Sequence, residues 1–234
     1  MRLAVMQPYL FPYLGYFQLA HSVDRFVLFD DVNFIKRGWI NRNRILLNGG
    51  AHRFTVPLEG ASQNRFINQI LTIKDDKWKT DLLKTIEWGY RRAPQFKPIF
   101  PLIEASVRYD ERNVARFIAH SLALVMRHVG IGAELVPTSS GYGNSTLKGQ
   151  DRIIDICARE GAQAYHNAIG GRELYDGRAF ANAGIELRFV RSRLREYQHK
   201  SPTFVPGLSI IDVLMWNELS DVQTMLSDYK VVEE

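Results

Sequence analysis

Cysteine is almost absent from this chain of 234 residues, since Cys157 is the only one. A single thiol excludes a disulfide-stapled scaffold and is typical of a reducing compartment. The 17 glycines and 9 prolines are too few for a collagen-like or low-complexity chain. No uninterrupted apolar stretch approaches the roughly 20 residues that a membrane-spanning helix needs. The chain is 46% hydrophobic and 24% charged, which is the composition of a globular protein that can bury a core.

The N-terminal segment is mostly apolar, so it has to be compared with a signal peptide. Gln7, Pro8, Pro12 and Gln18 interrupt the apolar run, and no small-x-small cleavage site follows it. We therefore expect a cytoplasmic protein without a transmembrane segment.

The charge balance indicates the kind of partner. The net charge of +5 and the isoelectric point near 9.3 favour an anionic one. Basic residues are not concentrated into the patches that nucleic acid requires, so we expect a small molecule and no nucleic acid. The six histidines show no metal-ligand spacing, and no metal site is predicted. The cofactor and the oligomeric state stay unknown at this stage.

The chain opens with a predicted strand, a helix and a second strand. Leu3 to Met6 and Arg25 to Phe29 have the pattern of buried strands, and Tyr13 to Ser22 fits a helix between them. This order is typical of a parallel α/β unit, in which functional loops follow the carboxyl ends of the strands. Asn48-Gly49-Gly50 then predicts a hairpin turn, and residues 66–73 a further strand.

The middle of the chain is predicted to be helical. Apolar residues at helical spacing mark one helix from about Trp78 to Tyr90, and a second that begins at Asp110 and ends at Gly130. Strands and helices alternate again afterwards. We predict a three-layer α/β fold with a mostly parallel, Rossmann-like sheet, a β-hairpin and a helical insertion. It forms a single composite domain over 1–234, with an N-terminal half (1–73), a helical middle (74–130) and a C-terminal half (131–234).

The loop after the first predicted strand is the first candidate site. It opens a helix, where free backbone N–H groups and the helix dipole attract anions. A glycine on the first helical turn would let a ligand or a strand approach closely. The alternative is that the aromatic residues of this loop only pack. The candidate substrate-binding residues here are Gln7, Tyr9, Phe11, Gly15 and Tyr16.

Two carboxylates follow the second predicted strand. Asp30 and Asp31 stand where a carboxylate can serve as a general base, a ribose ligand or a Mg²⁺ ligand. Together with Lys36 they are the candidate catalytic residues. The alternatives are an ordinary solvated loop and a structural Asp–Arg pair.

The same segment continues with cations and an aromatic residue. Arg42 and Arg44 alternate, so in an extended chain they share one face, where guanidinium groups suit phosphate or carboxylate. Trp39, Asn43 and these two arginines are therefore candidate substrate-binding residues.

Three later clusters complete the predicted site. Hydroxyl groups before a helix with a lysine at its entrance resemble a phosphate cradle, although P-loop spacing is absent, and an ordinary N-cap is the alternative. A tyrosine and an asparagine end another predicted strand, and a further tyrosine follows an arginine run that is typical of a solvated face. The substrate-binding candidates are Ser139, Ser140, Lys148, Asp151, Tyr165, Asn167 and Tyr197.

These motifs resemble the WbqC-like protein family. The resemblance rests on residues 6–17 (MQPYLFPYLGYF), on Asp30-Asp31-Val32 and on residues 39–43 (WINRN). Residues 148–152, Tyr165 and residues 208–212 also match, so the resemblance covers essentially the whole chain. Members of this family are encoded in bacterial gene clusters for O-antigen and related surface sugars. The resemblance therefore implies a role in the synthesis of such sugars, with aminoacyl transfer onto them as the proposed reaction. It implies no established catalytic residues.

A fainter similarity concerns the HxGH-type nucleotidyltransferase and ligase superfamily. Its strand–loop–helix motif has the order found here, but Tyr13 and Tyr16 stand in place of its histidines. A phenol donates one hydrogen bond and cannot supply an imidazolium charge. The positive charge would then come from Lys36, Arg42, Arg44 or Lys148.

These patterns lead to one hypothesis and two alternatives. We expect a group-transfer enzyme, of aminoacyl or acyl transfer, that acts on a nucleotide-linked or surface-polysaccharide sugar. Its partner would be an anionic small molecule, either a nucleotide sugar or an activated acyl donor. The alternatives are a non-catalytic sugar- or nucleotide-binding protein of a biosynthetic complex and an adenylate-forming ligase. All three require the candidate segments to converge on one positively lined hollow at the edge of the sheet.

Overall fold

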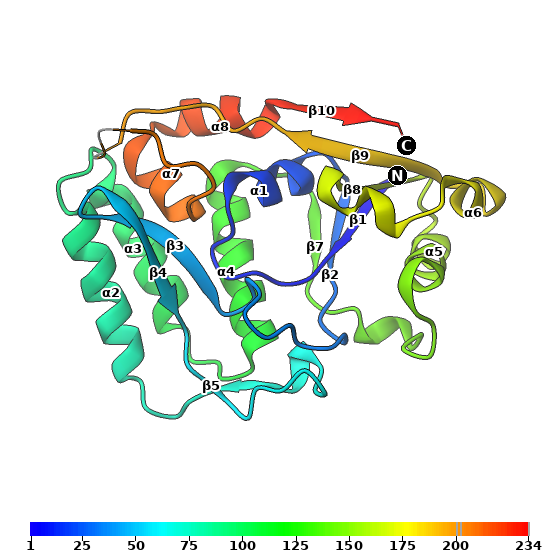
Figure 1. Ribbon diagram of the computed structural model, residues 1–234, viewed down its shortest axis with the longest axis horizontal. Helices are drawn as coiled ribbons and strands as arrows, with labels where there is room; N and C mark the ends of the chain where they lie inside the picture. Colours follow the sequence, from blue (N-terminus) through cyan, green and yellow to red (C-terminus); the bar gives the residue numbers. More distant parts are fainter. Residues whose placement is uncertain (200, 202, 234) are drawn as a thin grey trace.

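A six-stranded sheet forms the centre of the computed structural model, which describes residues 1–199, 201 and 203–233 (Figure 1). The strand order is β10-β9-β8-β1-β2-β7, and only β10 is antiparallel to its neighbour. The predicted α/β fold with a mostly parallel sheet is therefore confirmed, whereas the edge strand β10 was not predicted. The strands are β1 (Arg2–Met6), β2 (Arg25–Leu28), β7 (Glu134–Val136), β8 (Ala164–Ala168), β9 (Glu186–Ser192) and β10 (Tyr229–Val232).

The first strand lies in the interior of the sheet. From β1 the chain adds β2 and β7 on one side, and then returns to add β8 and β9 on the other. This is a doubly wound order, in which the direction of winding reverses between β1 and β8. Ligands of such folds bind beyond the carboxyl ends of the strands near the reversal.

Helices cover both faces of this sheet. On one face, α5 (Gly149–Glu160) and α6 (Gly177–Asn182) bury Cys157 and Phe180 against Leu3 and Tyr165. On the other face, α1 (Leu14–His21) and α4 (Val114–Val129) pack with α8 (Leu219–Ser227) in a second core cluster. Strands of the sheet contribute side chains to both core clusters, because successive residues of a strand point to opposite faces of the sheet.

The predicted hairpin is confirmed as β3 (Arg42–Leu47) and β4 (Gly50–Thr55). Asn48 and Gly49 have φ angles of 51° and 78°, the left-handed conformation that a tight hairpin turn requires. In Figure 1 the hairpin lies beside the sheet, next to α2 (Lys77–Tyr90), and β3 also contacts α7 (Ile210–Trp216).

The helical middle differs from the prediction in one helix and one helix start. An additional helix, α3 (Phe96–Arg108), was missed because proline disfavours helix interiors. Pro98 lies in its first turn, where the missing N–H has no helical partner in any case, and Ile99 and Ile103 anchor the helix in the core. Helix α4 begins after Asn113, whose side chain accepts hydrogen bonds from two backbone N–H groups, and not at Asp110.

The strand predicted over residues 66–73 is confirmed only for Leu71–Thr72. The segment forms a 3₁₀ turn, η1 (Ile67–Gln69), followed by the short strand β6 (Leu71–Thr72), which pairs with β5 (Leu58–Glu59). The Gln69 side chain accepts a hydrogen bond from the Phe66 backbone N–H at 3.1 Å, which closes the turn. Along the described ranges, no helix combines the length and the apolar character needed to cross a membrane.

Candidate functional site

The two aspartates after β2 are buried and hydrogen-bonded by the protein itself. Asp30 accepts hydrogen bonds from the Thr138 hydroxyl at 2.8 Å and from the Ser139 backbone N–H at 3.0 Å. The Ser139 hydroxyl also contacts both carboxylates. Burial raises the pKa of Asp30, and the neighbouring charge of Asp31 adds to this rise. The described hydrogen bonds to this side chain all come from donors of the protein itself.

Asp31 forms an ion pair with a residue of α5, one of the two helices that cover the face of the sheet with Cys157 and Phe180. Arg152 of α5 donates to its carboxylate at 2.5 Å and to its backbone carbonyl at 3.2 Å. The same guanidinium donates to Asn144, whose amide in turn donates to Asp155. The structural Asp–Arg pair that the sequence left open as an alternative is present, although its cation comes from α5 and not from the nearby arginines.

The loop after β1 is joined to the hairpin and to α7 by side-chain hydrogen bonds. Asn43 donates to the carbonyls of Leu10 and Phe11 at 3.0 and 2.7 Å. Ser209, at the start of α7, donates to the same Phe11 carbonyl at 2.7 Å. Phe11 has a φ of 41°, a conformation that is unusual for a non-glycine residue and is held here by these donors. Three motifs that are distant in sequence thus meet at one loop.

Gly15 lets this loop fold back over α1. A Cβ atom at this position would lie 2.4 Å from the Tyr13 ring and 2.6 Å from the Ser192 hydroxyl at the end of β9. The groups that approach Gly15 closely are therefore the Tyr13 side chain and the end of β9, both of the protein itself. Tyr16 is buried beneath, and its hydroxyl donates to the Gln7 carbonyl at 3.0 Å.

A cavity of about 240 Å³ opens where the loop, β3 and the segment after β9 meet. Arg44 lies over the Trp39 ring, with 5.6 Å between the guanidinium carbon and the ring centroid, and it reaches the Gly207 carbonyl at 3.4 Å. Burial raises the pKa of Tyr9 and of Tyr13, so both phenols are neutral hydrogen-bond donors at physiological pH. The cavity is lined by Tyr9, Pro12, Tyr13, Trp39, Asn43, Arg44, Leu194 and Gly207.

A second hollow of about 350 Å³ lies along the same strand. Arg42 lines it together with Lys36 and Arg37, two exposed cations. Arg42 and Arg44 alternate on β3 and so point to the same face, whereas Asn43 points to the buried one. Among the described residues, no carboxylate lines either hollow.

The remaining candidate residues lie away from these two hollows. Lys148 and Asp151 are exposed at the start of α5, and the Ser140 hydroxyl accepts a hydrogen bond from Asn68 at 2.9 Å. The Asn167 side chain donates to the hydroxyls of Tyr165 and Tyr175 at 3.1 and 2.8 Å. The expectation of one hollow that gathers every candidate residue is wrong, because neither described hollow along β3 is lined by any of these later candidates.

Tyr197 belongs to a buried network that the sequence analysis missed. Its hydroxyl donates to Asp212 at 2.6 Å, and Tyr90 donates to the other oxygen of this carboxylate at 2.7 Å. His199 lies 3.4 Å from the same carboxylate. The signal available in the sequence was the match of residues 208–212 to the family motif. Leu194 and Gly207, by contrast, line the cavity without any local signal.

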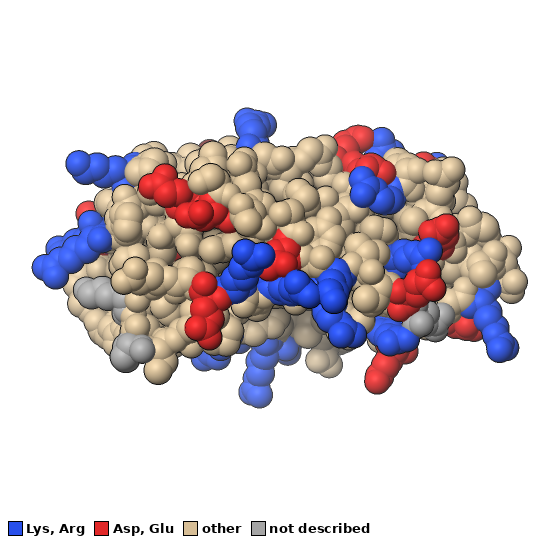
Figure 2. All heavy atoms as spheres, turned by 90° about the horizontal axis from the view of Figure 1, so that it is seen from above, with Lys and Arg blue, Asp and Glu red and all other residues tan. Residues whose placement is uncertain are grey.

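The arginine run before Tyr197 is largely paired. Arg188 contacts Glu186 and Glu233, and Arg193 and Arg195 both contact Asp228. Figure 2 shows basic side chains gathered across the middle of the upper face, with acidic ones beside them. This is the solvated, charge-balanced face that the pattern predicts. Within the described part of the chain, no group of three or more potential ligands is placed to hold a metal ion.

Comparison with known proteins gives a consistent picture. The model of the WbqC-like protein family matches residues 7–224. A protein of Mycobacterium tuberculosis (strain ATCC 25618 / H37Rv), described as "Uncharacterized protein Rv1507c", is 27% identical over 219 residues, which are 91% of this chain and 92% of that protein. No solved structure gives a significant match.

Proposed function

Since the chain belongs to the WbqC-like protein family, we propose that it binds an anionic, sugar-linked small molecule along β3 and transfers an acyl or aminoacyl group to the sugar. One observation supports this most directly. Arg42 and Arg44 are half-buried on one face of β3, and neither contacts a carboxylate among the described residues. A partly buried cation without a protein anion is costly, and a ligand phosphate or carboxylate removes that cost.

The two hollows suit chemically different parts of one ligand. The cavity at Trp39 and Tyr9 offers aromatic surface and neutral phenol donors, which suit a nucleobase or a sugar ring. The hollow at Arg42 and Lys36 offers positive charge, which suits a diphosphate. A nucleotide-linked sugar or an activated acyl donor contains both parts. We place this reaction in the cytoplasm and in the assembly of a surface polysaccharide, as the family resemblance and the single cysteine suggest.

The catalytic roles follow from what reaches the hollows. In the transfer, a hydroxyl or amino group of the sugar attacks the acyl carbonyl carbon, and the bond from that carbon to the donor's activating group breaks. The activating group leaves with the electron pair and takes up the proton that the nucleophile loses. Lys36 lines one of the hollows and can stabilise the negative charge that develops on the acyl oxygen. Asp30 and Asp31 are bound to Ser139 and Arg152, so we assign them to positioning the end of β2 and not to proton transfer.

A non-catalytic binding protein is the second candidate. It is favoured by the lack of a carboxylate or an imidazole on either hollow within the described residues. Turnover separates the two: with a nucleotide sugar and an acyl donor present, acylated sugar accumulates for an enzyme and not for a binding protein.

Calorimetry with UDP-glucose, UDP and glucose tests the binding site. We expect UDP-glucose to bind, and Arg42→Gln and Arg44→Gln each to weaken it by about tenfold or more at an unchanged melting temperature. Arg172→Gln, an exposed arginine of η3 (Ile169–Leu174), is the matched control. Equal affinity in all variants would place the ligand elsewhere, and a collapse in melting temperature would make the two arginines structural.

A further inference from the structure

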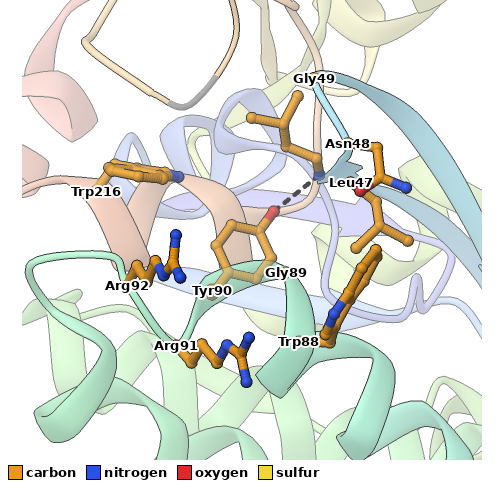
Figure 3. Close-up of a pocket in the computed structure, with 10 residues that line it drawn as sticks. Leu47, Asn48, Gly49, Trp88, Gly89, Tyr90, Arg91, Arg92 and Trp216 are labelled. Carbon is orange, nitrogen blue, oxygen red and sulfur yellow. Dashed lines mark hydrogen bonds between the residues drawn. The ribbon is translucent and has the colours of Figure 1, made fainter.

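A pocket of about 360 Å³ lies on the far side of the hairpin, at the end of α2. It is separate from the two hollows along β3, since it shares none of their lining residues. Figure 3 shows it between the hairpin turn, the last turn of α2 and the end of α7. Its volume is at the lower end of the range of small-molecule sites. The lining consists of Leu46, Leu47, Asn48, Gly49, Trp88, Gly89, Tyr90, Arg91, Arg92 and Trp216.

Two tryptophans from different helices border this pocket. Trp88 of α2 is 53% exposed, which is unusual for the largest apolar side chain, and Trp216 of α7 is partly buried across from it (Figure 3). A large exposed aromatic surface at a concave site marks a place where a ligand covers it.

Two arginines add positive charge to the same pocket. Arg91 and Arg92 are exposed, directly follow α2, and contact no carboxylate in the described ranges. None of the described residues that line the pocket carries a carboxylate. In Figure 3 Arg92 lies on the same side of the pocket as Trp216, Arg91 lies below Tyr90, and Trp88 lies across the pocket on the side of Leu47 and Asn48.

The floor of the pocket is rigid. The Tyr90 hydroxyl accepts a hydrogen bond from the Leu46 backbone N–H at 2.9 Å and donates to the buried Asp212 at 2.7 Å (Figure 3). A Cβ at Gly89 would lie 3.2 Å from the Leu46 carbonyl, so the glycine permits α2 to approach the hairpin closely. A preformed floor lowers the ordering cost of binding.

We propose that this pocket binds an acidic saccharide, a sugar ring that carries a carboxylate or a phosphate. The C–H face of a sugar packs on indole, its hydroxyls suit the Asn48 amide, and its anionic group suits the exposed guanidinium groups of Arg91 and Arg92. The pocket is independent of the site along β3, so this inference stands or falls separately from the function proposed above.

Calorimetry with the intact chain and defined probes tests the inference. The probes are a disaccharide that ends in glucuronic acid, the matching neutral disaccharide, glucose 1-phosphate and inorganic phosphate. We expect the acidic disaccharide or glucose 1-phosphate to bind. Comparing their affinities shows whether the pocket prefers a carboxylate or a phosphate. The neutral disaccharide should bind about tenfold more weakly or not at all.

Single substitutions test whether the acidic sugars bind in this pocket. Trp88→Ala and Arg92→Gln should each weaken the binding by about tenfold, whereas Arg172→Gln, at an exposed arginine outside both sites, should leave it unchanged. Both altered side chains are exposed, so the melting temperature should not change. Failure of both acidic sugars to bind, equal binding of inorganic phosphate or the neutral disaccharide, or insensitivity to Trp88→Ala would each overturn the proposal.

Discussion

Asp31 and Arg152, 121 residues apart in sequence, form an ion pair of 2.5 Å whose side chains are only 9% and 4% exposed. The guanidinium also lies 4.7 Å from the centroid of the Phe29 ring. The pair joins the end of β2 to α5 and thereby fixes the helical layer on one face to the sheet edge. Asp31 is also the carboxylate nearest in sequence to Arg42 and Arg44, and its pairing with Arg152 leaves it unavailable to them.

Breaking this pair should strongly destabilise the fold. Arg152→Met leaves the Asp31 charge buried without a cation, and we expect a loss of about 4 kcal/mol in the free energy of unfolding, measured by urea denaturation. The double variant Asp31→Leu/Arg152→Met should recover much of that loss. Arg159→Met removes an exposed pair with Asp155 and should cost less than about 1 kcal/mol. A small effect of Arg152→Met would show that water reaches the pair.

Gly15→Ala should destabilise the protein through a steric clash. The added methyl group would lie 2.4 Å from the Tyr13 ring, so the loop after β1 must shift, at a cost of about 2 kcal/mol. The same substitution at Gly132, where a Cβ would meet no atom within 4 Å, is the control. Adding Tyr13→Ala should restore part of the stability. If the double variant is no more stable than Gly15→Ala alone, the clash with this ring is not the cause.

His166 should make the fold sensitive to mild acid. Burial, together with the nearby Arg2 and Arg188, lowers its pKa from 6.5 to about 4. Between these values the unfolded chain binds a proton that the folded chain does not, so stability is complete above pH 6.5 and falls until about pH 4. The loss amounts to about 3 kcal/mol at 1.36 kcal/mol per pKa unit.

Urea unfolding of His166→Gln against pH measures this contribution. The difference between variant and parent should change across pH 6.5 to 4 and be flat above it. Subtraction removes other titrating groups, such as Asp30, whose raised pKa acts in the opposite direction as pH rises above 3.8. His52→Gln, on the exposed face of β4, is the matched control. A difference that does not depend on pH would mean that His166 titrates normally.

Asn113 should be the residue that starts α4. Its side chain caps the helix by accepting from the N–H groups of Ala115 and Arg116, and Asn113→Ala should cost about 1 kcal/mol in chemical denaturation. Asp110→Ala, three residues earlier, should change stability by less than about 0.5 kcal/mol. A larger loss at Asp110 than at Asn113 would restore the helix start that the sequence alone indicated.

Local patterns were enough for much of the fold. Buried strands at residues 3–6 and 25–29, the Asn48-Gly49 turn and the apolar stripe of α4 are signals that neighbouring residues carry by themselves, because strand and helix periods repeat over a few positions. The pattern failed where packing outweighed propensity. Pro101 lies inside α3 because buried isoleucines hold that helix, and residues 67–69 form a 3₁₀ turn before β6 because Gln69 bonds back to Phe66.

The candidate site likewise has features that local sequence patterns predict and features that they do not. Alternation along β3 was sufficient to place Arg42 and Arg44 on one face and Asn43 on the other, since that depends only on extended backbone. Which carboxylate meets which cation depends on distances in space between residues far apart in the chain. Only the tertiary structure therefore decided that Asp31 pairs with Arg152, that Leu194 and Gly207 close the cavity at Trp39, and that Trp88 and Trp216 face one pocket.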